Sequence, residues 1–175
     1  MSVHSRAFFL VRDPANAAKG RRRIRALIVG WGIRLDEETR NSLDVVSSEL
    51  ITNAIRHSDG PMLTVGVYAD PQLRRALIEV YDASMILPRA RQAQPDEEAG
   101  RGMLLVERLA LSHGAEHTSR GKRVWAELAL PEQAMTRHQL LAHPRRAGRG
   151  LLRRLRNLPP AGPWRNRPRA ALAAQ

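Results

Sequence analysis

One long amphipathic segment, residues 36–57, constrains the fold of this chain more than any other feature. Asp36 is a helix N-cap candidate, and the carboxylates of Glu37 and Glu38 follow in the first turn, where the helix dipole stabilises them. The apolar residues that recur along one face of this helix are Leu43, Val46, Leu50 and Ala54. A helix with such a face buries it against a neighbouring element, so the flanking segments decide the fold.

Those flanking segments alternate between strand and helix patterns. The predicted strands are residues 8–12, 62–69, 73–81, 115–118 and 124–130, and the predicted helices are residues 14–32, 36–57 and 100–111. Asp13-Pro14 has the residue types of a helix start, and residues 70–72 read as a hairpin loop. This order predicts an α+β two-layer sandwich, in which a mainly antiparallel sheet carries the helices on one face.

The net charge of +12 is concentrated at one end of the chain. Ten of the 29 basic residues follow residue 136, whereas none of the 17 acidic residues does, so the part before them is nearly neutral. We therefore predict a domain over residues 1–132 and a basic, largely disordered Arg/Pro-rich tail over residues 133–175. Leucines at helical spacing in that tail could contact nucleic acid, but no recognised binding motif accompanies them, and we favour a nonspecific extension.

Composition excludes several classes of function. The chain has no cysteine, so disulfides, thiolate metal sites and cysteine nucleophiles are excluded. The apolar run at residues 7–11 is too short for a signal peptide or a membrane span. We therefore expect a cytoplasmic protein without a membrane partner.

A polar stripe runs along the helix over residues 36–57. Glu49, Asn53 and His57 follow one another at four-residue spacing and share one face. A carboxylate can accept a proton from an attacking hydroxyl, and an amide oxygen is a hard ligand of the kind that Mg²⁺ takes beside phosphate oxygens. The same stripe could equally be the solvated face of an amphipathic helix, and taken alone it does not decide between the two.

Three further segments have residues suited to nucleotide chemistry. Asp82 ends a strand, where a carboxylate can accept the amine hydrogen of adenine or simply terminate the strand. Gly100-Arg101-Gly102 precedes a helix, whose free backbone amides favour anions, although most Gly-x-Gly segments are turns. Residues 121–125 form a hairpin leading into a strand, and Lys122 there could be an ordinary solvated turn residue.

Together these segments resemble the motifs of the histidine-kinase-like ATPase family, and most closely those of small actinobacterial anti-sigma-factor serine kinases. Residues 49–57 resemble the helix motif Glu-Leu-x-x-Asn-Ala-x-x-His, and Asp82 with Pro88 resembles the strand-end Asp and its following proline. Residues 100–103 resemble Gly-Arg-Gly-Leu, and residues 121–125 match Gly-Lys-x-Val-Trp. The resemblance covers residues 8–130.

The resemblance implies a serine/threonine protein kinase with ATP as substrate and Mg²⁺ as cofactor. It implies that Glu49 is the catalytic general base, Asn53 the Mg²⁺ ligand and Asp82 the adenine contact. The other ATP-binding positions that it implies are His57, Gly100, Arg101, Gly102 and Met103. The implied reaction transfers the γ-phosphoryl group to a serine of an anti-anti-sigma protein; a sigma factor and a second copy of the chain are further implied partners.

Departures from the family pattern keep a second function open. Residues 83–86 read Ala-Ser-Met-Ile, without the glycines that let a backbone approach the nucleotide. Arg123 stands where relatives often have threonine, and His113 where they often have tryptophan. The alternative to a kinase is therefore a nucleotide-binding or degenerate regulator that acts by protein–protein binding without catalysis.

Overall fold

The structure is a computed structural model that describes residues 3–88 and 101–132. In chain order its elements are β1 (His4–Val11), the 3₁₀ turn η1 (Pro14–Asn16), α1 (Ala17–Gly30), α2 (Glu37–His57), β2 (Met62–Asp70), β3 (Arg75–Asp82), α3 (Arg101–Leu109), β4 (Ser112–Thr118) and β5 (Gly121–Ala129). The basic tail expected over residues 133–175 lies outside the described residues.

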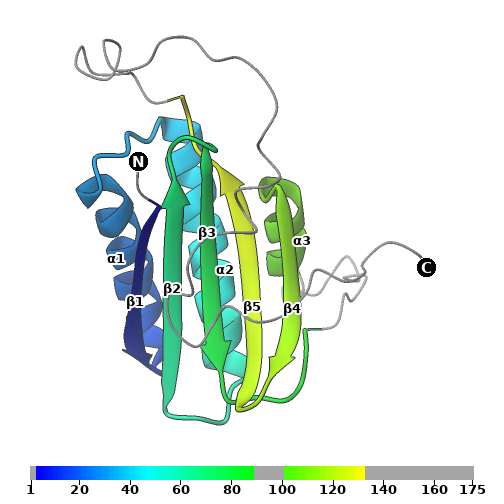
Figure 1. Cartoon of the computed structure of the whole chain (residues 1–175). Helices are drawn as coiled ribbons and strands as arrows, with labels where there is room; N and C mark the ends of the chain where they lie inside the picture. Colours follow the sequence, from blue (N-terminus) through cyan, green and yellow to red (C-terminus); the bar gives the residue numbers. More distant parts are fainter. Residues whose placement is uncertain (1–2, 89–100, 133–175) are drawn as a thin grey trace. The chain divides into compact units, whose positions relative to one another are not determined.

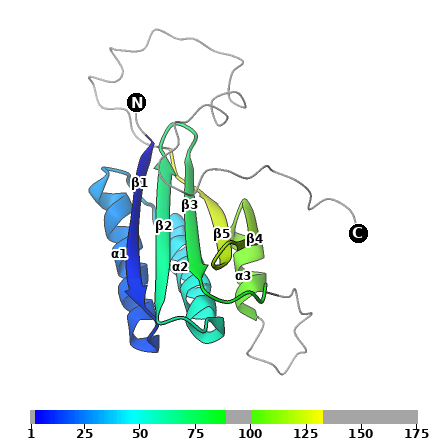
Figure 2. The ribbon, with the colours of Figure 1, turned by 60° about the horizontal axis from the view of Figure 1, so that its bottom comes forward.

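The strands form a single sheet in the described part of the chain. Their order is β1-β2-β3-β5-β4, and each neighbouring pair is antiparallel. The helices α1, α2 and α3 all lie on one face of this sheet (Figure 1), and the turned view in Figure 2 shows the same two layers. The predicted α+β two-layer sandwich is confirmed. No helix in the described ranges is long and apolar enough to cross a membrane.

The long helix α2 begins and packs as its sequence predicts. The Asp36 side chain caps it by accepting a hydrogen bond from the Thr39 backbone N–H at 2.8 Å, and the Thr39 hydrogen bonds lower the pKa of the Asp36 carboxyl. Leu43, Val46 and Leu50 are buried in the core between helix and sheet. Burial of this apolar face stabilises the position of α2, and with it the polar stripe beside that face.

Side chains alternate between the two faces of the sheet, and this alternation sorts the charged residues of β3 and β5. Asp82 pairs directly with Lys122, and both lie on the helix-bearing face together with buried residues such as Val80. The neighbouring pair, Tyr81 and Arg123, points to the opposite face. We call these the inner and outer faces; within the described residues, the outer face carries no helix (Figure 2).

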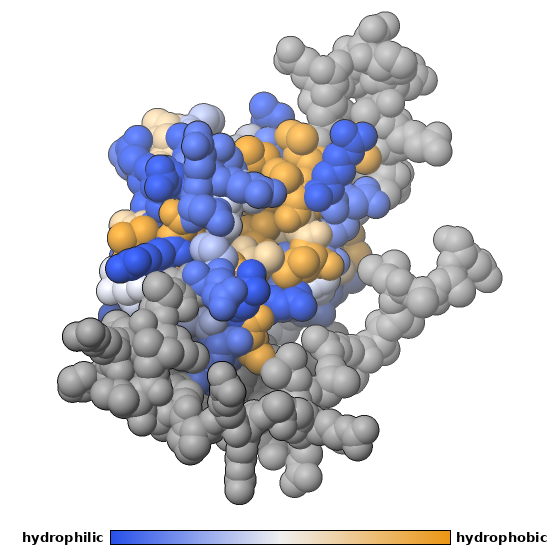
Figure 3. Space-filling model, turned by 90° about the horizontal axis from the view of Figure 1, so that it is seen from above, coloured by the Kyte–Doolittle hydropathy of each residue, from blue (hydrophilic) through white to orange (hydrophobic). Residues whose placement is uncertain are grey.

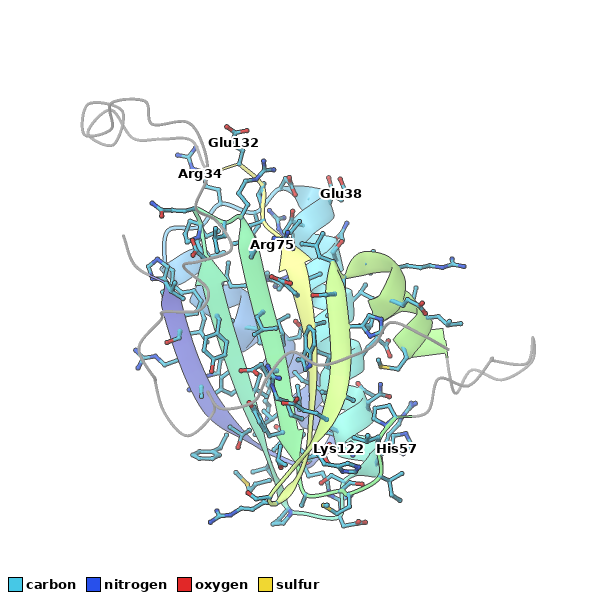
Figure 4. The ribbon with its side chains drawn as sticks, turned by 45° about the vertical axis from the view of Figure 1, so that its right-hand side comes forward. Arg34, Glu38, His57, Arg75, Lys122 and Glu132 are labelled. Carbon is cyan, nitrogen blue, oxygen red and sulfur yellow. The ribbon has the colours of Figure 1, made fainter. Side chains whose placement is uncertain are left out.

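The two ends of the sheet differ in character. Lys122 and His57 lie at one end, and Glu38 and Glu132 at the other (Figure 4). The end at which α2 begins, seen in Figure 3, is a mixture of hydrophilic and apolar side chains. Asp82 pairs with Lys122 at this end, and His57 is the last residue of α2 there. Two of the predicted nucleotide-binding residues therefore lie at the Lys122 end of the sheet (Figure 4).

Candidate functional site

A buried ion pair lies at the end of β3. Lys122 Nζ donates a hydrogen bond to Asp82 Oδ1 at 2.9 Å, and the two side chains are only 4% and 0% exposed. The backbone N–H of Ser84 donates to the same oxygen at 2.8 Å. The second oxygen of this carboxylate, Oδ2, is buried and has no hydrogen-bond partner within the described residues. Because buried polar atoms nearly always have a partner, Oδ2 indicates a place where a ligand can donate a hydrogen.

Three segments from different parts of the chain converge on Asp82. The Ser58 hydroxyl, at the end of α2, accepts hydrogen bonds from the backbone N–H groups of Ala83 at 3.3 Å and Gly60 at 3.2 Å. Gly121 has a φ of 143°, and a Cβ on it would come within 2.7 Å of the Ala83 Cα. Only glycine fits this close approach, which brings the turn before β5 against the end of β3.

Glu49, the first residue of the polar stripe of α2, lies against the start of α3. Glu49 and Asn53 are half-buried, and His57 is exposed near the end of α2. A Cβ placed on Gly102, the second residue of α3, would lie only 2.8 Å from the carboxyl carbon of Glu49. The structure therefore brings Glu49 and Gly102 together across α2 and α3, as expected if both line one site.

The other predicted positions near α3 are less completely described. Met103 is half-buried against the core. Arg101 is the first residue of α3, but its side chain falls outside the description, as does the whole of Gly100. Of the four ATP-binding positions implied at residues 100–103, the structure thus describes the surroundings of Gly102 and Met103.

Arg123 belongs to a separate cluster on the outer face. Its Nε donates to Glu79 Oε2, and its NH1 donates to Glu116 Oε1 at 3.0 Å. The guanidinium carbon lies 5.6 Å from the centre of the Trp125 ring. The Tyr81 hydroxyl also donates to Glu79 Oε2, at 3.2 Å. Arg123 therefore points away from Asp82, to the face of the sheet opposite the predicted nucleotide-binding residues.

The outer cluster is electrostatically coupled. Burial, followed by the negative charge of Glu79, raises the pKa of the Tyr81 hydroxyl. Burial by itself would lower the pKa of Arg123, but Glu79 and Tyr81 together raise it. The cluster therefore joins the Tyr81 phenol, the Glu79 carboxyl and the Arg123 guanidinium through hydrogen bonds.

Lys122 is the site residue that sequence reasoning missed. The interpretation of Lys122 as a solvated turn residue is wrong, since the structure buries it and pairs it with Asp82. A signal was present: the inner positions of β5 are Val124, Ala126 and Leu128, and counting back by two residues reaches Lys122. Strand periodicity continued into the turn would have placed Lys122 on the inner face.

Comparison with known protein families shows which family this chain belongs to. A profile of the histidine kinase-like ATPase domain matches residues 10–128, which includes every described site residue named above. This chain belongs to the histidine-kinase-like ATPase family. The match extends from the end of β1 into the end of β5, so it includes β2, β3, β4 and all three helices.

Solved structures support the fold of the ATPase domain. A crystal structure of the RsbU and RsbW domains of Rv1364c from Mycobacterium tuberculosis matches with a TM-score of 0.55 and 16% sequence identity. The match covers 73% of this chain and 32% of the Mycobacterium chain, so this chain spans about a third of that protein. No curated protein matches the sequence of the chain.

The donor set available to a metal ion is small. In residues 3–88 and 101–132, no cluster of three or more histidine or acidic side chains is placed to hold a metal on its own. Asn53 offers an amide oxygen on α2, one turn of helix from Glu49. Mg²⁺ that arrives with a nucleotide takes most of its ligands from phosphate and water, so a single protein oxygen suits it.

Proposed function

We propose that this ATPase domain, residues 1–132, binds Mg-ATP on the inner face at the Asp82 end and phosphorylates a serine or threonine of a small partner protein. The observation that carries the proposal is Asp82 Oδ2, a buried carboxylate oxygen without a partner in the described residues. The amino group of adenine is a donor that would satisfy it. Membership of an ATPase family supports ATP as the ligand.

In this proposal, two residues of α2 act at the phosphate end of the nucleotide. Glu49 accepts the proton of the attacking serine hydroxyl, whose oxygen forms a bond to the γ-phosphorus. The bond from the γ-phosphorus to the bridging oxygen then breaks, and ADP leaves with that oxygen. His57, Gly100, Arg101, Gly102 and Met103 surround the triphosphate in the same proposal.

Asn53 would hold Mg²⁺ through its amide oxygen. The ion would neutralise negative charge on the phosphates during the transfer. What the chain itself contributes is position, because Asn53 and Glu49 are one turn apart on the same helix, and the buried face of α2 holds that helix on the sheet.

The proposed partner follows from the resemblance to anti-sigma-factor serine kinases. It is a small anti-anti-sigma protein that carries the phosphorylated serine, with a sigma factor as a second binding partner. A homodimer and a cytoplasmic location belong to the same proposal.

Calorimetric titration of the full chain with Mg-ATP tests the nucleotide site. Asp82→Asn should weaken binding about 10- to 100-fold, the range for a hydrogen bond to a charged group. Asp44→Asn is the matched control, since Asp44 also pairs with a cation, Arg25 at 2.6 Å, and also has one buried oxygen without a partner in the described residues. Equal weakening by both variants, or no heat with the unchanged chain, would refute the site.

Phosphoryl transfer is tested separately from binding. Glu49→Gln should keep Mg-ATP affinity within a few-fold while transfer to a serine-containing partner is lost, because only the proton acceptor is removed. Retained transfer in Glu49→Gln would rule out Glu49 as the general base.

A second candidate, a regulator that binds its partner without catalysis, is favoured by one specific observation. Gly102 lies so close to Glu49 that even a methyl group would collide with the carboxylate, which restricts the approach of a substrate hydroxyl from that side. Partner capture that is equal with and without Mg-ATP, and unchanged in Glu49→Gln, would support this candidate. Strict dependence on the nucleotide would count against it.

A further inference from the structure

The Lys122 ammonium has more hydrogens than the structure uses. A lysine ammonium carries three donors, and within the described residues Asp82 Oδ1 is the one acceptor that Lys122 contacts. Its side chain is 4% exposed, so water has little access to the remaining hydrogens. The buried pair thus presents a cation with spare donors directly beside a carboxylate oxygen with a spare acceptor position.

An ion pair that served only to stabilise the fold would have the donors and acceptors of both groups satisfied by the protein. Burying two charges is expensive unless further hydrogen bonds satisfy both groups, and apolar residues of similar volume are often at least as stabilising. Here the carboxylate is satisfied at Oδ1, by Lys122 and the Ser84 N–H, and left open at Oδ2. The lysine is likewise only partly satisfied, so the two open groups are adjacent.

The two groups are also held firmly in place. Asp82 and Lys122 are directly opposite each other in the β3–β5 register, and the Ser84 N–H fixes the rotation of the carboxylate. Gly121, next to Lys122, packs against the backbone of Ala83. A fixed acceptor beside a fixed donor is the arrangement that reads two neighbouring atoms of a nucleobase edge.

We propose that Lys122 is a base-reading residue, which donates a hydrogen bond to the ring nitrogen N1 of adenine while Asp82 Oδ2 accepts from the neighbouring amino group. This inference rests on the proposed function and extends it to a residue that was outside the predicted site. Adenine fits because its amino donor and its N1 acceptor are adjacent. Hypoxanthine presents the reverse order, with an oxygen at C6 and an N–H at N1.

A competing role for Lys122 is to hold Asp82 in position without touching the base. The two roles differ in their response to the ligand. A base-reading lysine is energetically coupled to atom N1, whereas a positioning lysine changes the affinity for all adenine nucleotides by the same factor.

The test is a cycle between residue and ligand atom, measured by calorimetry on the full chain with magnesium. The ligands are ATP and 1-deaza-ATP, in which a C–H replaces N1. The unchanged chain should bind 1-deaza-ATP about 10- to 100-fold more weakly than ATP. In Lys122→Met that difference should shrink to less than about threefold.

Arg123→Met is the matched control, because Arg123 is the adjacent cation of β5 and points to the outer face. It should keep the full preference for ATP over 1-deaza-ATP. The same preference in Lys122→Met would overturn the inference and leave the proposed function standing.

The ligand pair also decides the question without any variant, should Lys122→Met fail to fold. Equal affinity of the unchanged chain for ATP and 1-deaza-ATP would overturn the reading of N1. Absence of ATP binding by the unchanged chain would instead overturn the proposed function, and this inference with it.

Discussion

Two ion pairs lie next to each other on β3 and β5, one fully buried and one partly exposed, and they are built differently. On the outer face, Glu79 accepts from both Arg123 and Tyr81, and Arg123 also binds Glu116. On the inner face, the pair of Asp82 and Lys122 leaves a carboxylate oxygen without a partner in the described residues.

This difference distinguishes an ion pair that stabilises the fold from one that can bind a ligand, although both consist of an acidic and a basic residue. A cluster whose donors and acceptors are matched rigidifies the sheet and needs no ligand. A buried pair with an unsatisfied donor or acceptor retains an unfavourable desolvation free energy, which a ligand that completes the hydrogen bonds can remove. The outer cluster is therefore assigned to stability and the inner pair to binding.

The largest expected effect is on stability. Asp82→Ala leaves the buried Lys122 ammonium without its counter-ion and should lower the free energy of unfolding by about 3–5 kcal/mol. Glu79→Ala should cost less, about 1–3 kcal/mol, because Arg123 keeps Glu116 and is 20% exposed. Urea unfolding followed by circular dichroism measures both.

The double variant Asp82→Ala/Lys122→Met serves as the control for this experiment. It should recover most of the lost stability, since no unpaired charge remains. If Glu79→Ala lowers the free energy of unfolding more than Asp82→Ala does, the proposed order of the two ion pairs in stability is wrong.

The second effect concerns nucleotide affinity. Glu79→Gln on the outer face should leave the affinity for Mg-ATP within about twofold, against the 10- to 100-fold loss expected for Asp82→Asn on the inner face. Calorimetry with the same nucleotide preparation measures both variants. A large loss in Glu79→Gln would show that the two faces are not independent.

Gly102 and Gly114 extend the comparison of the two faces of the sheet to close packing contacts. A Cβ on Gly102 would meet Glu49 on the inner side, and a Cβ on Gly114 would lie 2.9 Å from the Trp125 ring on the outer face. Replacing either by alanine should cost about 1–3 kcal/mol of stability through overpacking. Thermal unfolding measures this cost.

Only Gly102→Ala should also impair phosphoryl transfer, because it displaces Glu49 from the start of α3. A kinase assay with Gly114→Ala as control separates the two effects. Equal activity of the two variants would remove Gly102 from the site.

The smallest effect is expected at alkaline pH. Burial and the charge of Glu79 raise the pKa of Tyr81 in the folded chain. The unfolded chain therefore releases the phenol proton first, near the usual value of 10.0, and stability contributed by the neutral phenol is lost as pH rises above that value. Tyr81→Phe should show a shallower decline of stability above pH 10 in urea unfolding, and an identical slope would contradict the coupling.

The helices and strands were largely accessible from the sequence, because their signals are local. The α2 cap at Asp36 and its buried face at Leu43 and Leu50 follow from residue type and a period of 3.6. The β2–β3 hairpin follows from alternation and from Asp70, whose side chain accepts from the backbone of the following turn.

The site was accessible only in part, because its contacts join distant residues. Asp82 and Lys122 are 40 residues apart and meet because β5, rather than β4, lies beside β3. The contact of Gly102 with Glu49 depends on how α3 packs on α2, which no local pattern encodes. For the contact of Lys122 with Asp82, the alternation along β5 could have predicted the face of Lys122 but not its partner.

The most direct test of the central claim removes the one ligand group that Asp82 Oδ2 is proposed to bind. Full-length chain is titrated with Mg-ATP and with the triphosphate of purine riboside, which lacks the amino group of adenine. The account predicts that ATP binds and that the analogue binds about 10- to 100-fold more weakly. Equal affinity for the two nucleotides would contradict it.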